Sequence, residues 1–479
     1  MTKSDVWDLV VVGGGTAGIV GARTAASLGA RTLLVERDRM GGDCLWTGCV
    51  PSKTLLAAAH HVADARRAAA AGIHVAEVRV DFAAVMSRVH QAVATIEPDD
   101  SAVTLLTQGV VVRQGDVTFE TGNRLLVDGV GVATRGVLLA TGAGPALPPI
   151  PGLAEASPLT SDTVWALTEL PGRLVVLGGG SIGCELGQAM ARLGAEVTIL
   201  EGAQRILPRE DVDAANLVRA ALEFDGVRII TADPVASVEA NHHGPGGVVV
   251  LTAGDRIDYD VLLVAVGRTP ITDGFGLESV NVQRDERGFV IVDQSLRTTN
   301  RGIWAAGDIT GHPQFTHVAG MHGSLAASNA VLGLRRKVDA TVPRVTFTDP
   351  EVAAVGAPTD GAVQVTTTSH QHVDRAITEG RTDGFARLAL DDKGKIVGAT
   401  IVGPRAGESL GEITLAIRQG LTTRDLAATT HPYPTYADGA WKAAIADTQA
   451  RLALGISSTA IRFLGQVQRR RAERRRLQE

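Results

Sequence analysis

WDLVVVGGGTAGIVGARTAASLGARTLLVE, residues 7–36, decides the fold of the start of this chain. An apolar run, a glycine loop, an alanine-rich run and a second apolar run predict a strand, a turn, a helix and a strand. The glycines fit the spacing GxGxxG and are Gly13, Gly15 and Gly18. The first permits a tight turn, the second lets a phosphate approach the backbone, and the third lets helix and strand pack closely. The helix N-terminus then faces the phosphates, and Glu36 can accept hydrogen bonds from the ribose of an adenosine.

The same pattern recurs in RLVVLGGGSIGCELGQAMARLGAEVTILE, residues 173–201. Its glycines are Gly178, Gly180 and Gly183. This internal repeat predicts an α/β fold that binds two dinucleotides. Glu201 ends the second apolar run and favours NADH in this site, because a carboxylate bonds the 2′-hydroxyl of NADH and repels the 2′-phosphate of NADPH. Arg205 lies close by in sequence and leaves NADPH open as the less favoured cofactor.

Two cysteines with four residues between them, Cys44 and Cys49, follow the first glycine loop in GGDCLWTGCVPSKTL. We interpret them as a redox-active pair. A metal pair is the weaker reading, because zinc normally needs four ligands and the only other cysteine is Cys184, which we expect to be buried and inert. Cys49 precedes a run that should be helical, and a helix N-terminus lowers the pKa of a thiol. Pro51 suits the first turn of such a helix.

The composition is that of a globular α/β protein of several domains, with 479 residues, 45% apolar and 20% charged. A net charge of −6 implies neither a nucleic acid nor a membrane as partner. We expect no integral membrane segment, because no apolar run reaches about 18 residues. The acidic start, with Asp5 and Asp8, is unlike a secretion signal, and the predicted location is cytoplasmic.

The end of the chain is the exception to this charge distribution. Arginines at 469–471 and 474–476 follow AIRFLGQVQ, residues 460–468. We expect a solvated, frayed tail. Its apolar residues leave open a peripheral contact with a membrane surface or a partner.

Four further motifs occur in order along the chain. They are LLATGA (138–143), VAVGRTP (264–270), TTNRGIWAAGDIT (298–310) and VTFTDPEVAAVG (345–356). With the glycine loops and GGDCLWTGCVPSK, they make the sequence similar to the class I pyridine nucleotide-disulfide oxidoreductases, a family that includes dihydrolipoyl dehydrogenase, glutathione reductase and mercuric reductase.

The resemblance implies two Rossmann-like domains, for FAD and NAD, and a C-terminal α+β dimerisation domain. The implied order is FAD-binding (1–150), NAD(P)-binding (151–270), a return to the FAD-binding fold (271–342), an interface domain (343–460) and a basic tail (461–479). Family members are usually homodimers whose interface domain completes the active site of the partner.

The resemblance also implies site residues. Electrons pass from NADH to FAD and then to the disulfide, leaving Cys49 as a thiolate against the flavin and Cys44 as the exchange thiol. Lys53 and Glu185 match the lysine and glutamate beside the flavin, and Asp308 would bond the ribityl chain. The remaining cofactor-binding positions within the matched motifs are Thr141, Gly142, Gly267 and Gly307.

One position departs from the disulfide reductases. In THPYPTYADGA, residues 430–440, Tyr433 stands where those enzymes carry a histidine before ProThr, and Asp438 stands where they carry a glutamate. A tyrosine with a pKa near ~10 stays protonated and is a poor base at neutral pH, unlike histidine. His431 could replace the base only if the loop were re-registered, and we interpret it as a packing residue.

The tyrosine resembles that of mercuric reductase, yet no cysteine follows Cys184 to form the paired-cysteine tail of that enzyme. We therefore predict an FAD-dependent NAD(P)H oxidoreductase that reduces a small-molecule acceptor, either a disulfide, a quinone or a similar compound. The alternatives are reduction of mercury(II) or another soft metal, dihydrolipoyl dehydrogenase activity, and a non-enzymatic, flavin-bound redox sensor.

Overall fold

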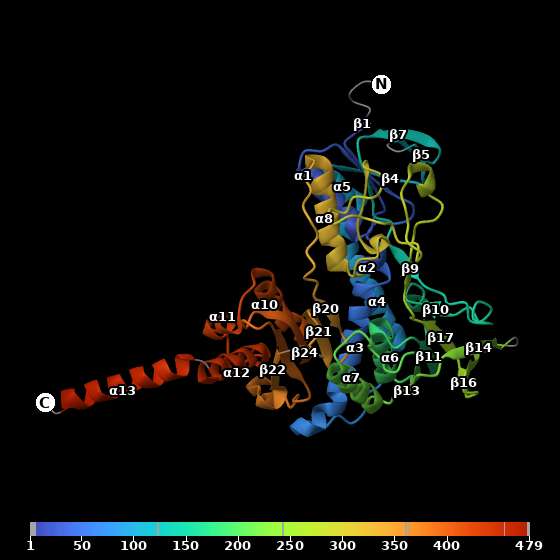
Figure 1. Ribbon diagram of the computed structural model, residues 1–479. Coiled ribbons are helices and arrows are strands. Elements are labelled where there is room, and N and C mark those ends of the chain that lie inside the picture. Colours follow the sequence, from blue (N-terminus) through green and yellow to red (C-terminus); the bar gives the residue numbers. More distant parts are fainter. Residues whose placement is uncertain are drawn as a thin grey trace. The chain divides into compact units, whose positions relative to one another are not determined.

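The computed structural model describes residues 6–121, 124–241, 244–359, 362, 364–454 and 456–476. The chain divides into two compact units. Unit 1 comprises Met1–Pro208 and Leu222–Ala340, and unit 2 comprises Arg209–Ala221 and Thr341–Glu479. Figure 1 labels many of the elements of both units.

The first sheet of unit 1 is parallel and has the strand order β19-β8-β2-β3-β4. The strands are β2 (Leu9–Val12), β3 (Thr32–Glu36), β4 (Val110–Gln114), β8 (Val137–Leu139) and β19 (Ile303–Ala305). The order reverses between β2 and β8, so the loops that leave these strands diverge at a topological switch point, where α/β sheets bind ligands.

Both faces of this sheet are covered. Helices α1 (Thr16–Ser27) and α8 (Thr316–Leu332) pack together over the face that carries Leu9 and Val11. Val10 and Val12 point to the other face, where they join the buried side chains of a second sheet with the order β1-β7-β6-β5. Its strands are β1 (Val6–Trp7), β5 (Val117–Thr121), β6 (Arg124–Val127) and β7 (Val130–Thr134). Burial on both faces explains the uninterrupted apolar run at the start of the chain.

The predicted repeat forms a second parallel sheet with the order β10-β17-β11-β12-β13. Its strands are β10 (Leu159–Thr160), β11 (Arg173–Leu177), β12 (Glu196–Glu201), β13 (Arg228–Thr231) and β17 (Val261–Val264). Helix α6 (Ser181–Leu193) follows β11, and α7 (Val212–Phe224) follows β12. The order again reverses beside the glycine-bearing strand, between β11 and β17.

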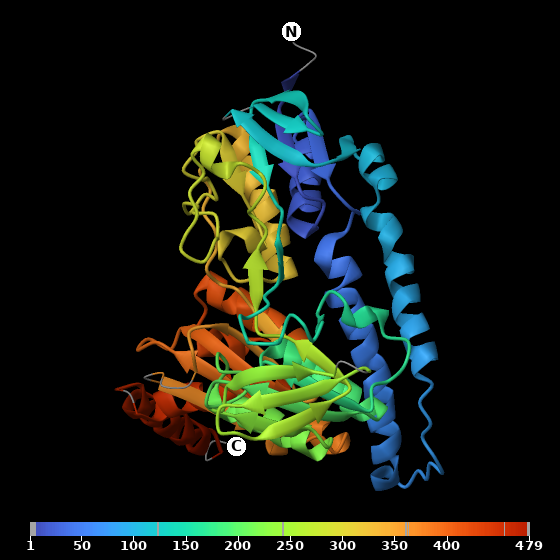
Figure 2. The same cartoon turned by 90° about the vertical axis from the view of Figure 1, so that its right-hand side faces the viewer.

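Smaller elements complete unit 1. The antiparallel strands are β9 (Ala143–Pro145), which pairs with β18 (Arg268–Pro270), and the meander β14 (Val235–Ala240), β15 (Gly247–Leu251) and β16 (Arg256–Tyr259). The helices are α2 (Gly42–Trp46), α3 (Cys49–Arg67), α4 (Phe82–Ile96) and α5 (Ala102–Thr107). Figure 2 shows α3 and α4 side by side. The predicted helix after the cysteine pair is confirmed, and it begins at Cys49.

Unit 2 contains an antiparallel sheet with the order β20-β21-β24-β23-β22. The strands are β20 (Arg344–Thr346), β21 (Glu351–Gly356), β22 (Gln364–Ser369), β23 (Phe385–Leu390) and β24 (Ile396–Gly403). The helices are α9 (Asp374–Thr378), α10 (Ala406–Gln419), α11 (Thr423–Ala428), α12 (Asp438–Leu454) and α13 (Ile456–Arg476). Side chains of β21, β23 and β24 form one core with α10 and α12. This is the α+β arrangement that the sequence predicts for this part of the chain.

The end of the chain differs from the expected frayed tail. Residues 456–476 form α13, a helix of 21 residues. Its composition explains the helix, because arginine, glutamine and alanine are good helix formers and no proline interrupts the segment.

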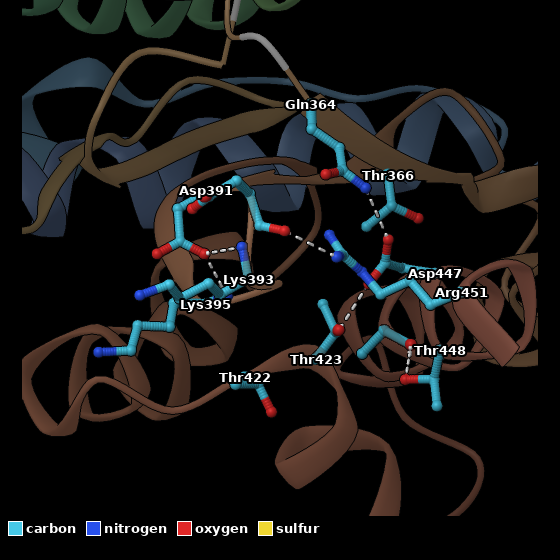
Figure 3. Close-up of polar contacts among 12 residues, drawn as sticks. Gln364, Thr366, Asp391, Lys393, Lys395, Thr422, Thr423, Asp447, Thr448 and Arg451 are labelled. Atoms are coloured by element: carbon cyan, nitrogen blue, oxygen red, sulfur yellow. Dashed lines mark hydrogen bonds and ion pairs between the residues drawn. The ribbon is translucent and has the colours of Figure 1, made fainter. Parts of the chain in front are cut away.

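A buried carboxylate joins three elements of unit 2 (Figure 3). Asp447 on α12 is 6% exposed and accepts hydrogen bonds from Gln364 Nε2 at 3.1 Å and Thr423 Oγ1 at 2.6 Å. Arg451, one turn later on α12, donates to the same carboxylate at 2.8 Å. Asp447 therefore fixes α12 against β22 and α11.

We expect Asp447→Ala to lower the free energy of unfolding by about 3 kcal/mol, because it leaves buried donors and one arginine without their acceptor. For a chain of 479 residues that melts in one transition, this corresponds to a melting temperature lower by about 3 °C, measured by calorimetry. Thr448→Ala on the same helix is the control, since Thr448 bonds only the carbonyl of Ala444 among the described contacts. Equal melting temperatures of the two variants would show that the Asp447 carboxylate does not hold α12 against β22 and α11.

Candidate functional site

The first glycine loop has the steric properties that the sequence predicts. Gly13 has φ +108°, and a Cβ at this position would lie 2.4 Å from the carbonyl oxygen of Ala140. A Cβ on Gly18 would lie 1.9 Å from the carbonyl oxygen of Gly13, so only glycine lets α1 pack this close to the loop. Gly15 is the N-cap of α1, and a Cβ there would meet only the Cα atom of Gly42, at 3.8 Å, which is an ordinary contact. The N-terminus of α1 is thus accessible to an anion.

The second loop repeats this geometry. Gly178 has φ +107°, and a Cβ there would lie 2.5 Å from the carbonyl oxygen of Ala265. A Cβ on Gly183 would lie 1.9 Å from the carbonyl oxygen of Gly178, and nothing lies within 4 Å of the Cβ position of Gly180. The two loops therefore share the same steric constraints as well as the same sequence pattern.

The two terminal acids also occupy equivalent positions. Glu36 accepts hydrogen bonds from the backbone N–H groups of Gly14 and Asp38, and Glu201 accepts them from Gly179 and Ala203, each of the latter at 2.8 Å. Both acids are partly exposed. Each carboxylate is fixed beside its glycine loop, where its remaining lone pairs can accept hydrogen bonds from ribose hydroxyls.

Arg205, which the sequence places near the second site, has its guanidinium group turned to the backbone. It donates to the carbonyl oxygens of Leu207 at 2.9 Å and Pro208 at 3.1 Å. Recognition of a 2′-phosphate would compete with these two bonds.

A groove of about 470 Å³ lies at the switch point of the first sheet. It is formed by the loops that follow β2, β3, β8 and β19, together with α2 and the start of α8. The predicted site residues among its lining are Gly15, Glu36, Cys44, Thr141, Gly142, Gly307 and Asp308. Gly267 is not among them, but its neighbour Arg268 is.

The residues of this groove fit FAD. The N-terminus of α1 lines the groove and suits a pyrophosphate, and Glu36 suits an adenosine ribose. The groove is also lined by Gln314, whose buried Nε2 has no hydrogen-bond partner among the described residues. A donor left unpaired in this way is costly unless a ligand accepts its hydrogen bond.

Asp308 shares the groove with a cation that the sequence analysis did not single out. Arg268 Nε lies 3.5 Å from Asp308 Oδ2, and Arg268 Nη2 lies 3.3 Å from Asp43 Oδ2. Burial raises the pKa of the Asp308 carboxyl despite the attraction of Arg268. The signal for Arg268 is its place in VAVGRTP, directly after the predicted Gly267.

The two cysteines come together at the junction of α2 and α3. Cys44 lies on α2, and Cys49 is the first residue of α3. The Cys49 Sγ atom lies 3.2 Å from the Oγ1 atom of Thr316, the first residue of α8, a contact that sequence reasoning missed. Cys49 is the more exposed of the two residues, and Cys44 lines the groove.

Protons are distributed unequally between these thiols. The hydrogen bond that Cys44 donates raises its own pKa and lowers the pKa of Cys49 to about 6, against the opposing effect of burial. Thr316 and the cation of Lys53 lower the pKa of Cys49 further. In the dithiol state, Cys49 is therefore a thiolate at neutral pH and Cys44 is a thiol.

Lys53 and Glu185 form an ion pair with an Nζ–Oε2 distance of 2.7 Å. Glu185, on α6, has a side chain 6% exposed, and Lys53 lies one turn after Cys49 on α3. The sequence predicts these two residues for one site, and the structure brings them together. Cys184 is fully buried, and burial raises the pKa of its thiol, which excludes it as a ready nucleophile.

Tyr433 belongs to unit 2, and its side chain is exposed. Its hydroxyl donates to Asp374 Oδ2 at 2.6 Å, and Lys442 Nζ lies 3.1 Å from Asp374 Oδ1. The hydrogen bond to Asp374 raises the pKa of Tyr433, so the phenol stays protonated and cannot act as a general base at neutral pH.

Asp438 and His431, which the sequence analysis considered together with Tyr433, each make contacts of their own. Asp438 begins α12, is 1% exposed, and accepts a bond from the backbone N–H of Thr435 at 3.4 Å. His431 lies 2.9 Å from Glu412, contacts the carbonyl oxygen of Thr429 and packs against Trp441. His431 is thus a packing residue in this loop.

In the part of the chain that the structure describes, no group of three or more His, Cys, Asp or Glu residues could hold a metal ion. None of the described helices is both long and apolar enough to cross a membrane.

Comparison with known proteins agrees with this geometry. The family model described as pyridine nucleotide-disulphide oxidoreductase matches residues 7–323. The model of the dimerisation domain of the same group matches residues 342–444.

Several characterised proteins resemble nearly the whole chain. A mercuric reductase from Streptomyces lividans is 38% identical over 90% of this chain and 94% of its own length. A dihydrolipoyl dehydrogenase from Chlamydia muridarum is 36% identical over 91% of this chain and 95% of its own length.

Solved structures give the same result. LpdA from Mycobacterium tuberculosis has a TM-score of 0.85 and 30% identity, covering 92% of this chain and 99% of its own. The HOCl-induced flavoprotein disulfide reductase RclA from Escherichia coli, solved as a Cu(II) complex, has a TM-score of 0.82 and 28% identity with the same coverage.

The proton distribution at the cysteine pair can be measured without an acceptor. In reduced protein we expect Cys49 to react with iodoacetamide as a thiolate, with a midpoint near pH 6 in Cys44→Ser, which keeps a hydroxyl donor. Cys44→Ala removes the donor and should raise the midpoint by about one unit. Buried Cys184 contributes little to the reaction in folded protein. A common midpoint near about 8.5 in both variants would contradict the assignment.

Proposed function

Because the chain belongs to the pyridine nucleotide-disulphide oxidoreductase family, whose members are enzymes that use FAD with NAD(P)H, we propose that it passes electrons from NADH through Cys44 and Cys49 to a small-molecule acceptor. The observation that carries the proposal is the junction of α2 and α3, where Cys44 lines the groove and Cys49 contacts Thr316, with the pKa of Cys49 lowered and that of Cys44 raised. Such a dithiol can donate two electrons, and its negative charge lies on Cys49.

The cofactors are assigned by their loops. FAD would lie in the groove of the first sheet, held by the N-terminus of α1, Glu36 and Asp308. NADH would lie at the second glycine loop, where the fixed carboxylate of Glu201 disfavours a 2′-phosphate and the guanidinium group of Arg205 is bonded elsewhere. Bound FAD supplies the electron transfer between reduced nicotinamide and the disulfide.

The reaction of the cysteine pair balances with Cys44 as the thiol and Cys49 as the thiolate, the states that their pKa shifts favour. Reduction breaks the sulfur–sulfur bond with two electrons and one proton, leaving the thiol of Cys44 and the thiolate of Cys49. Lys53 stabilises the negative charge and is itself held by Glu185 at 2.7 Å. The family resemblance makes Cys44 the exchange thiol. The higher exposure of Cys49 does not support this order, so the assignment of Cys44 as the exchange thiol rests on the resemblance and on the lowered pKa of Cys49.

We propose that the protein is a homodimer, because it carries the dimerisation domain of the family at residues 342–444. We also propose the domain order that the sequence predicts. In such a dimer, residue 433 of one copy would lie beside the cysteine pair of the other copy. A cytoplasmic location suits a cysteine pair that cycles between disulfide and dithiol.

We propose an acceptor whose reduction does not require residue 433 to remove a proton from it. A quinone meets this condition. Oxidation of dihydrolipoamide, in which the dithiol is the electron donor and NAD+ the acceptor, does not fit. Its thiol must lose a proton to a base, and Tyr433 holds its own proton toward Asp374. A soft metal ion is the second candidate, favoured by the mercuric reductases among the relatives and by the Cu(II) complex of RclA.

An anaerobic assay of NADH oxidation with a quinone, Hg(II), Cu(II) and a panel of disulfides tests the acceptor class. We expect turnover with the quinone or a metal ion to exceed turnover with every disulfide. Cys44→Ser should lose acceptor turnover at least 100-fold while the bound flavin is still reduced by NADH. Cys184→Ser is the matched control and should keep turnover within about twofold. If Cys44→Ser keeps full turnover, the cysteine pair is not the donor.

Tyr433→His tests the missing base directly. A histidine at this position would titrate near neutral pH, and general base catalysis contributes about 10²–10⁴-fold. We therefore expect the oxidation of dihydrolipoamide by NAD+, and the reduction of a small disulfide by NADH, to rise at least tenfold. Tyr433→Phe removes the hydroxyl without adding a base and should give no gain. An unchanged rate in Tyr433→His would show that the tyrosine is not the barrier.

A further inference from the structure

Helix α13 carries features that the proposed oxidoreductase chemistry does not use. It spans Ile456–Arg476 and lies beyond the matched dimerisation domain, which ends at residue 444. It is the terminal helix that follows α12 in Figure 1. Phe463 and Leu464 on this helix are 64% and 60% exposed, although both are large apolar side chains.

The charge of this helix is opposite to that of the whole chain. Residues 456–476 contain seven arginines and one glutamate, whereas the chain has a net charge of −6. The described arginine side chains are Arg469, Arg470, Arg471 and Arg474, and all of them are exposed. The positive charge is thus concentrated at the C-terminal end, directly after the apolar residues.

Helical spacing places the two kinds of side chain on one face. Phe463 and Val467 are four residues apart, and Arg470 and Arg474 continue the same row toward the C-terminus. Leu464 and Arg471 lie in the adjacent row. A single surface can therefore contact the exposed aromatic ring and the arginines together.

We propose that α13 docks the enzyme on an anionic lipid bilayer, with Phe463 and Leu464 inserted at the headgroup boundary and the arginines on lipid phosphates. A cluster of four or more arginines is typical of segments that bind anionic lipids, and an apolar anchor beside such a basic cluster strengthens the binding. The long arginine side chains keep their charge at the phosphates while their stems cover apolar surface.

Other occupants fit this helix less well. A second copy of α13 would bring two arginine-rich segments together with only one glutamate in each to pair with them. A nucleic acid would bind the arginines but would leave the exposed leucine without a role. An anionic bilayer satisfies both the charge and the apolar surface. The docking goes beyond the proposed reaction and does not depend on its acceptor.

Vesicle co-sedimentation of the full chain tests the proposal. We expect binding to vesicles of equal phosphatidylcholine and phosphatidylglycerol, weak binding to pure phosphatidylcholine, and release at high salt. Each lost arginine should lower the partition coefficient by about fivefold, so Arg469→Gln, Arg470→Gln and Arg471→Gln together should lower it about 100-fold. Phe463→Ser with Leu464→Ser should lower it at least tenfold.

A matched control removes three exposed cations elsewhere. Arg335→Gln, Arg336→Gln and Lys337→Gln changes the net charge equally in unit 1 and should leave vesicle binding intact. Each variant should keep its flavin content and melting temperature, because the substituted side chains are exposed.

Three results would overturn the docking. The first is no binding of the full chain to the anionic vesicles. The second is equal loss of binding in the two triple variants, or no loss in the Phe463 and Leu464 variant, since binding would then be unspecific adsorption of charge. The third is tighter binding to a 20-nucleotide RNA than to the vesicles at the same salt, which would make the partner a nucleic acid.

Discussion

Helices α1 and α6 each pack very closely against the glycine loop that precedes them. The positions of the site residues in unit 1 depend on these two contacts. At Gly18 and Gly183 a Cβ would lie 1.9 Å from the carbonyl oxygen of the first glycine of the loop, a distance that no side chain can accommodate. These contacts fix where α1 and α6 start, and hence where their N-termini point. Glu185 lies two residues after Gly183, so the same constraint brings its buried carboxylate to Lys53. A nucleotide loop and the reactive cysteine are thus linked by one ion pair.

Lys53 in turn acts on Cys49 because both lie on α3, one turn apart. The thiolate of Cys49 does not depend on this cation alone, since the hydrogen bond from Cys44 has the larger effect and Thr316 adds a further bond. Three elements, α2, α3 and α8, therefore meet at one sulfur. This arrangement separates the charge of the dithiol, which is the property that a two-electron donor of this kind needs.

The sequence predicted what depends on local spacing. The glycine loops, the terminal acids Glu36 and Glu201, and the start of α3 are each encoded within about thirty residues, and the structure has them where they were expected. Long-range contacts were not predictable in this way. Thr316 reaches Cys49 across 267 positions, and Arg268 lies between Asp43 and Asp308 only because their strands and loops converge. Helix α13 was missed because its arginines were read as a solvated block.

The contact between Tyr433 and Asp374 shows why a residue type alone does not settle chemistry. The sequence identifies a tyrosine in place of a base, but a tyrosine could still donate a proton to an acceptor. Asp374, 59 residues away, accepts a hydrogen bond from the hydroxyl group of Tyr433 and forms an ion pair with Lys442. The outward-facing part of the hydroxyl therefore offers lone pairs and no proton. We propose that this side chain selects acceptors that need neither an acid nor a base at this position, which separates the protein from the dihydrolipoyl dehydrogenases it resembles in sequence.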